Sequence, residues 1–205
     1  MEKLIDFIKK VKLSICTDDS DGRVNSISDE KTLIKHMLEY GKENNISVYE
    51  PPVRHWYDIM WNNHPIQIKS SSCNAADNWN SKKSLLYALT DMSIDEIDQC
   101  PNKHSTIQEL LVSRISKKDK PRDMNILVIN KNDGAVQFKK LCELDKLTVN
   151  GNNLPFQIHW GNNLSCQPNE RTRAEATKFI LEAYLGSICK KRQQDRPELL
   201  ESLLR

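Results

Sequence analysis

The chain has 205 residues, of which 38% are hydrophobic and 28% are charged, and its formal net charge at pH 7 is +2. This length can bury a core, and no repeats are apparent, so we expect one domain, or one domain with a small appended subdomain. A net charge close to zero does not exclude nucleic-acid binding, because one face of the protein can still be basic. The six cysteines lack the paired C-x-x-C spacing of zinc sites, so we expect free thiols.

The N-terminal part of the chain predicts two helices. Residues 1–10 form an amphipathic pattern broken by charges, unlike a signal peptide or a membrane span, so we expect a cytoplasmic protein without membrane contact. Residues 28–31 can cap a second helix, which ends at Gly41 or at residues 44–45. Its apolar positions repeat at helical spacing and are Leu33, Ile34, Met37 and Leu38.

The next segments alternate between predicted strands and helices. Short strands are expected at residues 47–50 and 57–61, and the turn-forming residues 62–65 lead into a strand at residues 66–70. The most hydrophobic strand, at residues 125–130, is a candidate for the sheet centre. The remaining expected elements are helices at 81–89, 105–115 and 170–191, a capping box at 93–96 and a strand at 156–160. This order predicts an α/β (α+β) fold with a mixed central β-sheet flanked by helices.

An acid, an amide and a lysine are expected to come together on the hairpin. Gln67 and Lys69 share one face of their strand because side chains alternate, and a paired strand could bring Asp58 to the same edge. An acid that binds a hard divalent cation, beside a lysine that stabilises negative charge, suits metal-assisted phosphodiester hydrolysis. Alternatively, Asp58 is an ordinary turn acid and Lys69 is a solvated residue on an exposed strand.

On these residues, the chain resembles the PD-(D/E)XK nuclease superfamily, and most closely its type II restriction endonucleases. The resemblance covers about residues 28–90 and departs from the family pattern at two positions. Tyr57 stands where a proline usually precedes the first acid, and Gln67 stands at the second acidic position. An amide oxygen can still coordinate a metal, although it carries no charge.

The resemblance implies a restriction-endonuclease-like core at about residues 28–130 and a C-terminal strand and helix region at about residues 150–205. It further implies an Mg²⁺ ion held by Asp58 and by Gln67, the latter directly or through the Ile68 carbonyl, with Lys69 stabilising the transition state. Glu30 is a possible supplementary acid from the second helix, with Glu39 and Glu50 as rivals. Alternatively, Glu30 is a helix N-terminal acid favoured by the macrodipole.

A segment at residues 70–82, dense in small polar and amide side chains, is expected to be a loop that contacts DNA. Some of its residues could equally cap the following helix. The basic segments 117–122 and 190–192 are phosphate-contact candidates if they converge, and solvated surface otherwise. The candidate DNA-binding residues are Asn74, Asp77, Asn78, Asn80, Lys82 and Lys83.

The resemblance therefore predicts a Mg²⁺-dependent, sequence-specific endonuclease for double-stranded DNA. We expect a homodimer, since a two-fold dimer cuts both strands of a palindrome most easily. A cognate methyltransferase is a possible partner. The alternatives are a repair or junction-resolving nuclease of the same superfamily and a DNA-binding protein without cleavage activity.

Overall fold

The computed structural model describes residues 1–119, 122–152, 154–191 and 201. It confirms the mixed α/β class, with a mixed central sheet and helices. The chain divides into two compact units, which are described one at a time. Unit 1 comprises residues 1–75 and 125–139, and unit 2 comprises residues 76–124 and 140–205. The single domain over residues 1–205 stays a prediction.

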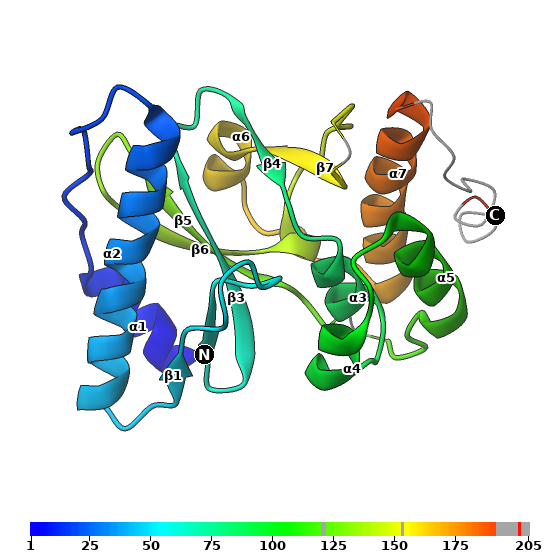
Figure 1. Cartoon of the computed structure of the whole chain (residues 1–205), viewed down its shortest axis with the longest axis horizontal. Coiled ribbons are helices and arrows are strands. Elements are labelled where there is room, and N and C mark those ends of the chain that lie inside the picture. The colour runs from blue at the N-terminus through cyan, green and yellow to red at the C-terminus, as the bar shows by residue number, and fades with distance from the viewer. Residues whose placement is uncertain (120–121, 153, 192–200, 202–205) are drawn as a thin grey trace. The chain divides into compact units, whose positions relative to one another are not determined.

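A five-stranded sheet organises unit 1, in the order β1-β2-β3-β5-β6 (Figure 1). The pairs β1–β2 and β2–β3 are antiparallel, whereas β3 and β5 run parallel. β3 is therefore the middle strand, and β5, which was expected at the centre, lies next to it. The strands are β1 (Val48–Tyr49), β2 (Ile59–Trp61), β3 (His64–Ser71), β5 (Asn125–Asn130) and β6 (Val136–Lys140), the last of which ends in unit 2.

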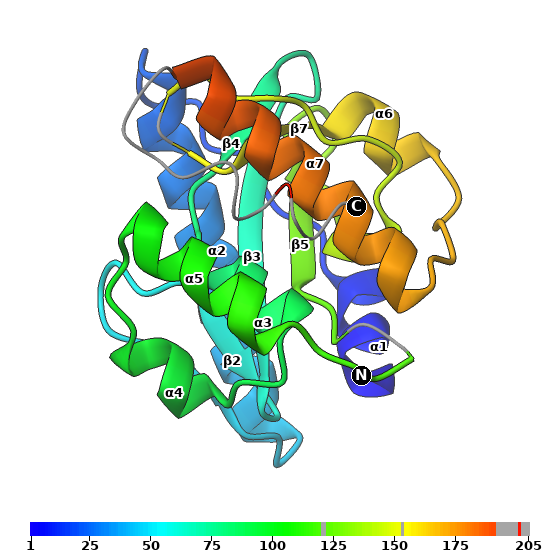
Figure 2. The ribbon, with the colours of Figure 1, turned by 90° about the vertical axis from the view of Figure 1, so that its right-hand side faces the viewer.

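Two helices, α1 (Glu2–Lys10) and α2 (Gly22–Glu43), pack against this sheet, with α2 alongside β3 (Figures 1 and 2). Their apolar residues recur every three or four positions, so each helix presents one hydrophobic stripe to the sheet. Phe7 of α1 packs on Trp61 of β2, with ring centroids 6.0 Å apart. The buried helix residues of this core are Leu4, Phe7, Ile8, Leu33, Ile34 and Met37.

The turn between β2 and β3 sets the register of the hairpin. Asn62 and Asn63 both have positive φ, at 46° and 64°, as a two-residue type I′ hairpin requires. This turn confirms the predicted turn at residues 62–65 and pairs Ile59 with Ile66. Continuing that register by one residue places Asp58 opposite Gln67.

Strand β6 was not predicted, and a glycine turn connects it to β5. Gly134 has φ +70°, and a side chain there would collide with the carbonyl oxygen of Leu13. The Leu13 N–H donates to the Gly134 carbonyl at 3.0 Å, which holds the segment after α1 against this turn. A residue other than glycine would therefore disturb both the turn and this contact.

Unit 2 contains most of the helices and a two-stranded antiparallel sheet of β4 (Ala76–Trp79) and β7 (Phe156–His159). The predicted capping box is confirmed, since Ser93 and Glu96 bond reciprocally at the start of α4. In Figure 2, α3, α5 and α7 face the viewer. The helices are α3 (Lys83–Leu89), α4 (Ile94–Gln99), α5 (His104–Arg114), α6 (Trp160–Ser165), α7 (Arg173–Lys191) and the 3-10 turn η1 (Leu141–Glu143).

Most other predicted element ends are displaced by one to three residues, and three further predictions are wrong. Helix α2 starts six residues before Ser28, because Asp21 caps it by accepting from the Arg23 N–H at 2.8 Å. The expected polar loop at residues 70–82 contains β4, whose pairing with β7 no local pattern reveals. Trp160, expected at a strand end, starts α6 instead.

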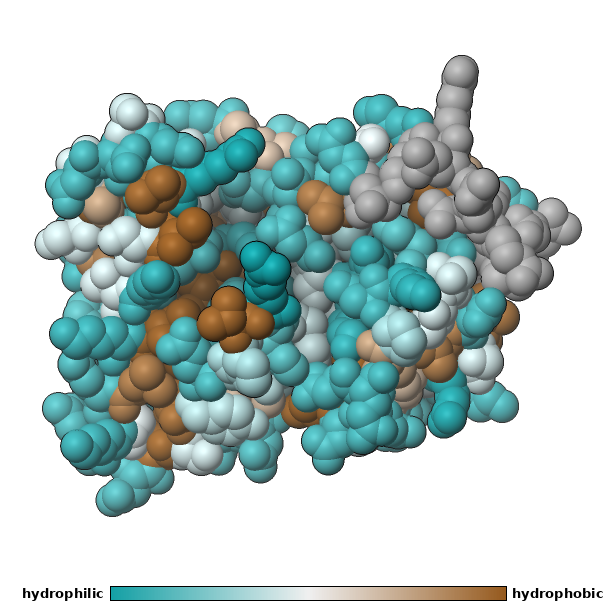
Figure 3. All heavy atoms as spheres, viewed as in Figure 1, coloured by the Kyte–Doolittle hydropathy of each residue, from teal (hydrophilic) through white to brown (hydrophobic). Residues whose placement is uncertain are grey.

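The surface of the described residues shows few large hydrophobic side chains. Figure 3 shows hydrophobic side chains over α2, where Val24 and Ile27 are 48% and 52% exposed. Val24 and Ile27 lie one helical turn apart, and a few exposed apolar residues of this kind are ordinary on protein surfaces. None of the helices within the described ranges is long and apolar enough to cross a membrane. All six cysteines are free thiols, as predicted.

Candidate active site

The hairpin brings Asp58 and Gln67 into direct contact. The Asp58 N–H donates to the Ile66 carbonyl at 2.9 Å, which extends the β2–β3 ladder by one bond. The Gln67 Nε2 donates to Asp58 Oδ2 at 2.9 Å, and the Ile68 N–H donates to the same oxygen at 2.6 Å. Three of the residues expected to hold a metal therefore meet around one carboxylate.

Beyond Ile66, the edge of β3 that faces β2 no longer pairs with a strand of the described residues. Its backbone N–H groups donate to side-chain carboxylates instead. Asp58 accepts from the Ile68 N–H, and Glu30 Oε1 accepts from the Ser70 N–H at 3.2 Å. These two N–H groups lie two residues apart, roughly 6.6 Å along the strand. The Ile68 carbonyl points to the same edge as its N–H group. The edge therefore presents carboxylate, carbonyl and carboxylate oxygens in sequence.

Glu30 reaches this edge from the middle of α2. Because α2 begins at Gly22, Glu30 is its ninth residue, and the interpretation of Glu30 as a first-turn acid stabilised by the macrodipole is wrong. Glu30 shares the helix face of Leu33 and Met37, which points to the sheet. The expectation that Glu30 approaches the sheet edge is confirmed.

A second acid of α2, Asp29, was not predicted as part of the site. Its side chain is only 2% exposed and accepts two hydrogen bonds, from the Cys16 N–H to Oδ1 and from the Ser70 hydroxyl to Oδ2, each at 2.8 Å. Asp29 thereby fastens the helix to the end of β3, next to the bond made by Glu30. In the sequence, Asp29 is an acid within one helical turn of Leu33, but it also fits the predicted cap at residues 28–31.

Gln67 has a buried side-chain oxygen that could accept a hydrogen bond or coordinate a cation. The residue is 6% exposed, and its Oε1 is buried without a hydrogen-bond partner. Buried polar oxygens are normally satisfied, so this atom calls for an explanation. Within the described ranges no group of three or more His, Cys, Asp and Glu side chains could hold a metal ion. A metal at this edge would therefore need the amide and carbonyl oxygens as well as carboxylates.

Lys69 lies one residue beyond the carbonyl and pairs with Val128 of β5. Its side chain projects from the same sheet face as Gln67 and is half-buried. Among the described residues, its ammonium makes no hydrogen bond or ion pair. The nitrogen is therefore available to an anionic ligand on the Gln67 face.

The rival acids lie on the surface. Glu39 is exposed and pairs with Lys35 one turn away at 4.0 Å, a geometry that contributes little energy. Glu50 follows β1 and is also exposed. Neither has a hydrogen bond to the β3 edge among the described residues, in contrast to Glu30.

The residues predicted to contact DNA occupy different local environments. Asn74 and Asn80 are exposed, whereas Asp77 and Asn78 belong to β4 rather than to a loop. Lys82 occupies the N-cap position of α3, and Lys83 Nζ donates to the Asp98 carbonyl at 2.9 Å. Ser81, one residue before this N-cap, still contributes to the start of the helix, because its hydroxyl accepts from the Ser84 N–H at 3.2 Å.

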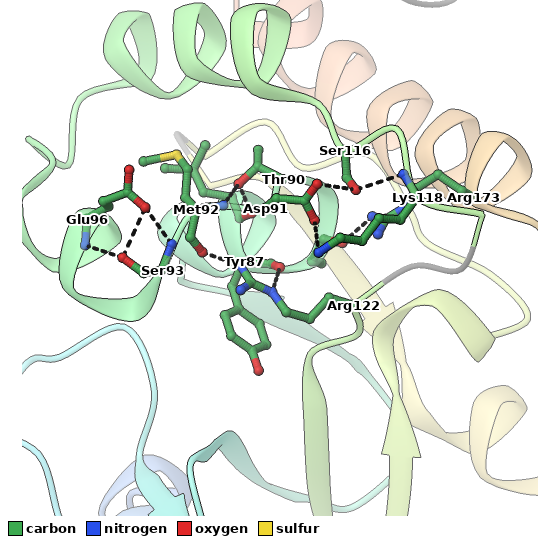
Figure 4. A network of polar contacts seen from close by, with 12 residues as sticks. Tyr87, Thr90, Asp91, Met92, Ser93, Glu96, Ser116, Lys118, Arg122 and Arg173 are labelled. Carbon is green, nitrogen blue, oxygen red and sulfur yellow. Dashed lines mark hydrogen bonds and ion pairs between the residues drawn. The ribbon is translucent and has the colours of Figure 1, made fainter.

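Two residues of the basic segment 117–122, Lys118 and Arg122, bind protein groups in unit 2 (Figure 4). Arg122 donates to the carbonyls of Tyr87 and Met92 at 2.8 and 2.6 Å, and its guanidinium lies 4.1 Å from the Tyr87 ring centroid. Lys118 pairs with Asp91 at 3.1 Å. Arg122 is thus bound to protein groups rather than open to phosphate. Residues 120, 121 and 192 lie outside the described residues.

No protein-family model matches the chain, and no curated protein sequence matches it.

Proposed function

We propose that the chain is a Mg²⁺-dependent, sequence-specific endonuclease of the restriction type, which hydrolyses phosphodiester bonds of double-stranded DNA in the cytoplasm. The observation that carries this proposal is the edge of β3, where Asp58 and Glu30 flank the Ile68 carbonyl. Lys69 projects beside this edge, on the face of Gln67. The combination supplies oxygen ligands and a cation for an anionic substrate.

The oxygens at this edge fit a hard divalent cation. Mg²⁺ prefers carboxylate, carbonyl and water oxygens, and the buried Gln67 Oε1 without a partner adds an amide oxygen to the set. Asp58, Gln67 and the Ile68 carbonyl would hold the ion, and Glu30 could supplement them. When bound, the ion would polarise a phosphoryl oxygen and lower the pKa of a coordinated water.

Lys69 would stabilise the charge that develops during hydrolysis, and the fixed geometry of the hairpin would orient the ligands. As water attacks phosphorus and the bond to the leaving oxygen breaks, negative charge builds on the phosphoryl oxygens. An ammonium placed beside them stabilises that charge more in the transition state than in the ground state. Asp58 is held by its bonds to Gln67 and Ile68, so it can orient a ligand without first reorganising.

A DNA-binding protein without cleavage activity is the second candidate. One observation favours it: Gln67 stands at the second acidic position and donates its amide hydrogen to Asp58. The hydrogen bond between Gln67 and Asp58 then stabilises the hairpin without any metal. A repair or junction-resolving nuclease would use the same edge, so it differs in substrate rather than in site.

Digestion of mixed plasmid DNA separates these candidates. The full chain is incubated with plasmids in Mg²⁺, in EDTA, and as the Asp58→Ala variant in Mg²⁺. Discrete bands that need both Mg²⁺ and Asp58 support the restriction enzyme, whereas nicks or smears with the same dependence indicate a less specific nuclease. Binding without cutting in all three reactions would replace the proposal with the second candidate.

A further inference from the structure

The small sheet of unit 2 has one buried face and one face open to solvent. Trp79 of β4 and Phe156 of β7 stack on the buried face, with centroids 5.8 Å apart. Because side chains alternate along a strand, the neighbouring positions project from the other face. Asn78 and Gln157 form a directly opposed pair there. Asn78 is exposed, and Gln157 is half-buried.

A chain of hydrogen bonds determines which way these amides point. The Asn152 N–H, which can only donate, bonds to Asn150 Oδ1 at 2.6 Å, so the other end of Asn150 must be Nδ2. That Nδ2 donates to Asn78 Oδ1 at 2.7 Å, and Gln157 Nε2 donates to the same oxygen at 3.0 Å. Each assignment follows from the one before, so no amide in the chain can be reversed alone.

Asn150 is itself anchored to α7. It is 1% exposed, and its N–H donates to the Ser187 hydroxyl at 2.8 Å. The helix approaches closely because Gly186 has no side chain, since a Cβ there would lie 2.7 Å from Val149 Cγ2. Asn150 is thus a buried positioning residue that presents its amide to Asn78.

This arrangement leaves one donor and one acceptor side by side on the open face. Asn78 retains its Nδ2 hydrogens, because its Oδ1 accepts both bonds. Gln157 retains its Oε1, because its Nε2 is the donor. Neither retained atom has a hydrogen-bond partner among the described residues. The pair therefore offers a fixed pattern of one donor next to one acceptor.

We propose that Asn78 and Gln157 together recognise one adenine through the major groove, an inference that rests on the proposed function. Adenine presents an acceptor at N7 beside a donor at N6, which complements the pair. Guanine presents two acceptors, and cytosine or thymine presents one polar group. A two-stranded β-ribbon fits the major groove. β4 and β7 would enter it with their open face, with Thr148 bridged to the outer edge of β7 at Gln157. Asn78 would donate to N7, and Gln157 would accept from N6.

The test measures base preference at every position of the bound site. The full chain selects DNA from a random library with Ca²⁺ in place of Mg²⁺, and each base pair of the selected site is then replaced in turn. Asn78→Ala and Gln157→Ala should lose discrimination at one shared A·T pair, by about fivefold or more. On wild-type protein, 7-deazaadenine at that position should weaken binding similarly, with little further loss in Asn78→Ala.

Asn78→Asp is a sharper variant. It keeps an oxygen that accepts from Asn150 and Gln157, so the ribbon should fold, but it replaces the outward donor with an acceptor. Preference at the same position should therefore shift from adenine towards cytosine, whose N4 donates. His159→Ala, on the open face two residues from Gln157, is the matched control and should leave the adenine preference unchanged. Thermal unfolding of each variant checks that the fold is intact.

The outcomes separate the two proposals. Loss of adenine preference at one shared position in the Asn78 and Gln157 variants supports the inference. A wild-type site whose base preferences all persist in those variants overturns the inference and leaves the endonuclease proposal standing. Wild-type protein that selects no sequence overturns the inference and the proposed sequence-specific function together.

Discussion

One carboxylate oxygen of Asp58 accepts two hydrogen bonds, from the side-chain amide of Gln67 at 2.9 Å and from the Ile68 N–H at 2.6 Å. An acid at position 67 could not make this bond unless it were protonated. The glutamine therefore stabilises the hairpin without a metal, whereas two carboxylates there would need a cation between them. Gln67 combines a structural contact with an oxygen that can still serve as a ligand.

Replacement of Gln67 by Glu should make the protein depend more strongly on Mg²⁺. Without metal, the new carboxylate faces Asp58 across a mostly buried contact, and we expect a loss of about 1–3 kcal/mol in the free energy of unfolding. With Mg²⁺, the added charge should restore stability and lower the Mg²⁺ concentration needed for half-maximal cutting. Thermal unfolding and cleavage rates, each titrated with Mg²⁺, measure the two effects.

The Gln67→Ala variant is the companion to this experiment. It removes both the bond to Asp58 and the amide oxygen, so turnover and metal use should weaken together. If wild type, Gln67→Glu and Gln67→Ala share one Mg²⁺ titration curve, Gln67 has no part in metal binding, and the second ligand must be another residue such as Glu30.

Lys69→Ala should abolish cutting while leaving DNA binding within roughly tenfold, or about 1.4 kcal/mol, of wild type. The reason is that the ammonium stabilises charge that develops mainly in the transition state. Lys35→Ala is the control, because Lys35 is an exposed lysine of the same unit with only a 4.0 Å pair to Glu39. A Lys69→Ala protein that cuts at the wild-type rate would refute the assigned site.

Asp29 and Glu30 are adjacent on α2, yet substitution of Asp29 should lower stability, whereas substitution of Glu30 should lower the cleavage rate. Asp29→Ala leaves the Cys16 N–H and the Ser70 hydroxyl without their acceptor, and we expect a loss of about 2–4 kcal/mol in the free energy of unfolding. Glu30→Gln keeps an acceptor for the Ser70 N–H, so it should retain stability within about 0.5 kcal/mol but cut more slowly. Denaturant unfolding and plasmid cleavage of both variants test the contrast.

Glu39→Ala is the control for both substitutions, since Glu39 is exposed on the same helix. It should change neither stability nor cutting. Equal stability losses in Asp29→Ala and Glu30→Gln would mean that both acids only fasten α2 to β3, which would remove Glu30 from the proposed site.

The hairpin could be predicted because its signals are local. Residues 62 and 63 are asparagines, which tolerate positive φ, and the strands on either side alternate, so the proximity of Asp58 to Gln67 follows from a few neighbouring residues. Glu30 could be assigned to the sheet-facing side of its helix from the 3.6-residue period alone.

The features that could not be predicted depend on partners distant in the sequence. Strand β4 has one large apolar residue, Trp79, and becomes a strand only by pairing with β7, about 80 residues later. The amides of Asn78, Asn150 and Gln157 likewise form one network across 72 and 79 residues. The start of α2 was mistaken because Asp21 and Ser28 are both competent caps, and the local pattern does not choose between them.

We expect the chain to form a homodimer, because cutting both strands of a palindromic site is simplest with two copies related by a two-fold axis. Sedimentation equilibrium at micromolar concentration should give twice the 23.7 kDa chain mass. The same measurement with a short duplex carrying the selected site should show two chains per duplex. A monomer in both samples that still makes double-strand breaks would contradict this prediction.

Asp123 of unit 2 should make stability fall as pH rises. Its carboxylate accepts from the Cys142 N–H at 2.9 Å, but burial disfavours the charged form and raises the pKa of Asp123 to about 6. The folded protein therefore holds this proton more tightly than the unfolded chain, in which an aspartate titrates near pKa 3.9. The stabilisation by this group is complete below about pH 4 and is lost as pH rises through 6.

Asp123→Asn removes this titration while retaining an oxygen that can accept from Cys142. Relative to wild type, the free energy of unfolding of Asp123→Asn should therefore rise by about 2 kcal/mol between pH 4.5 and pH 7.5. Subtracting wild type from variant cancels the other carboxyl groups, and Asp95→Asn, an exposed aspartate of the same unit, is the control. Denaturant unfolding at the two pH values measures the difference. A difference between variant and wild type that is equal at both pH values would show that the Asp123 proton is not linked to folding.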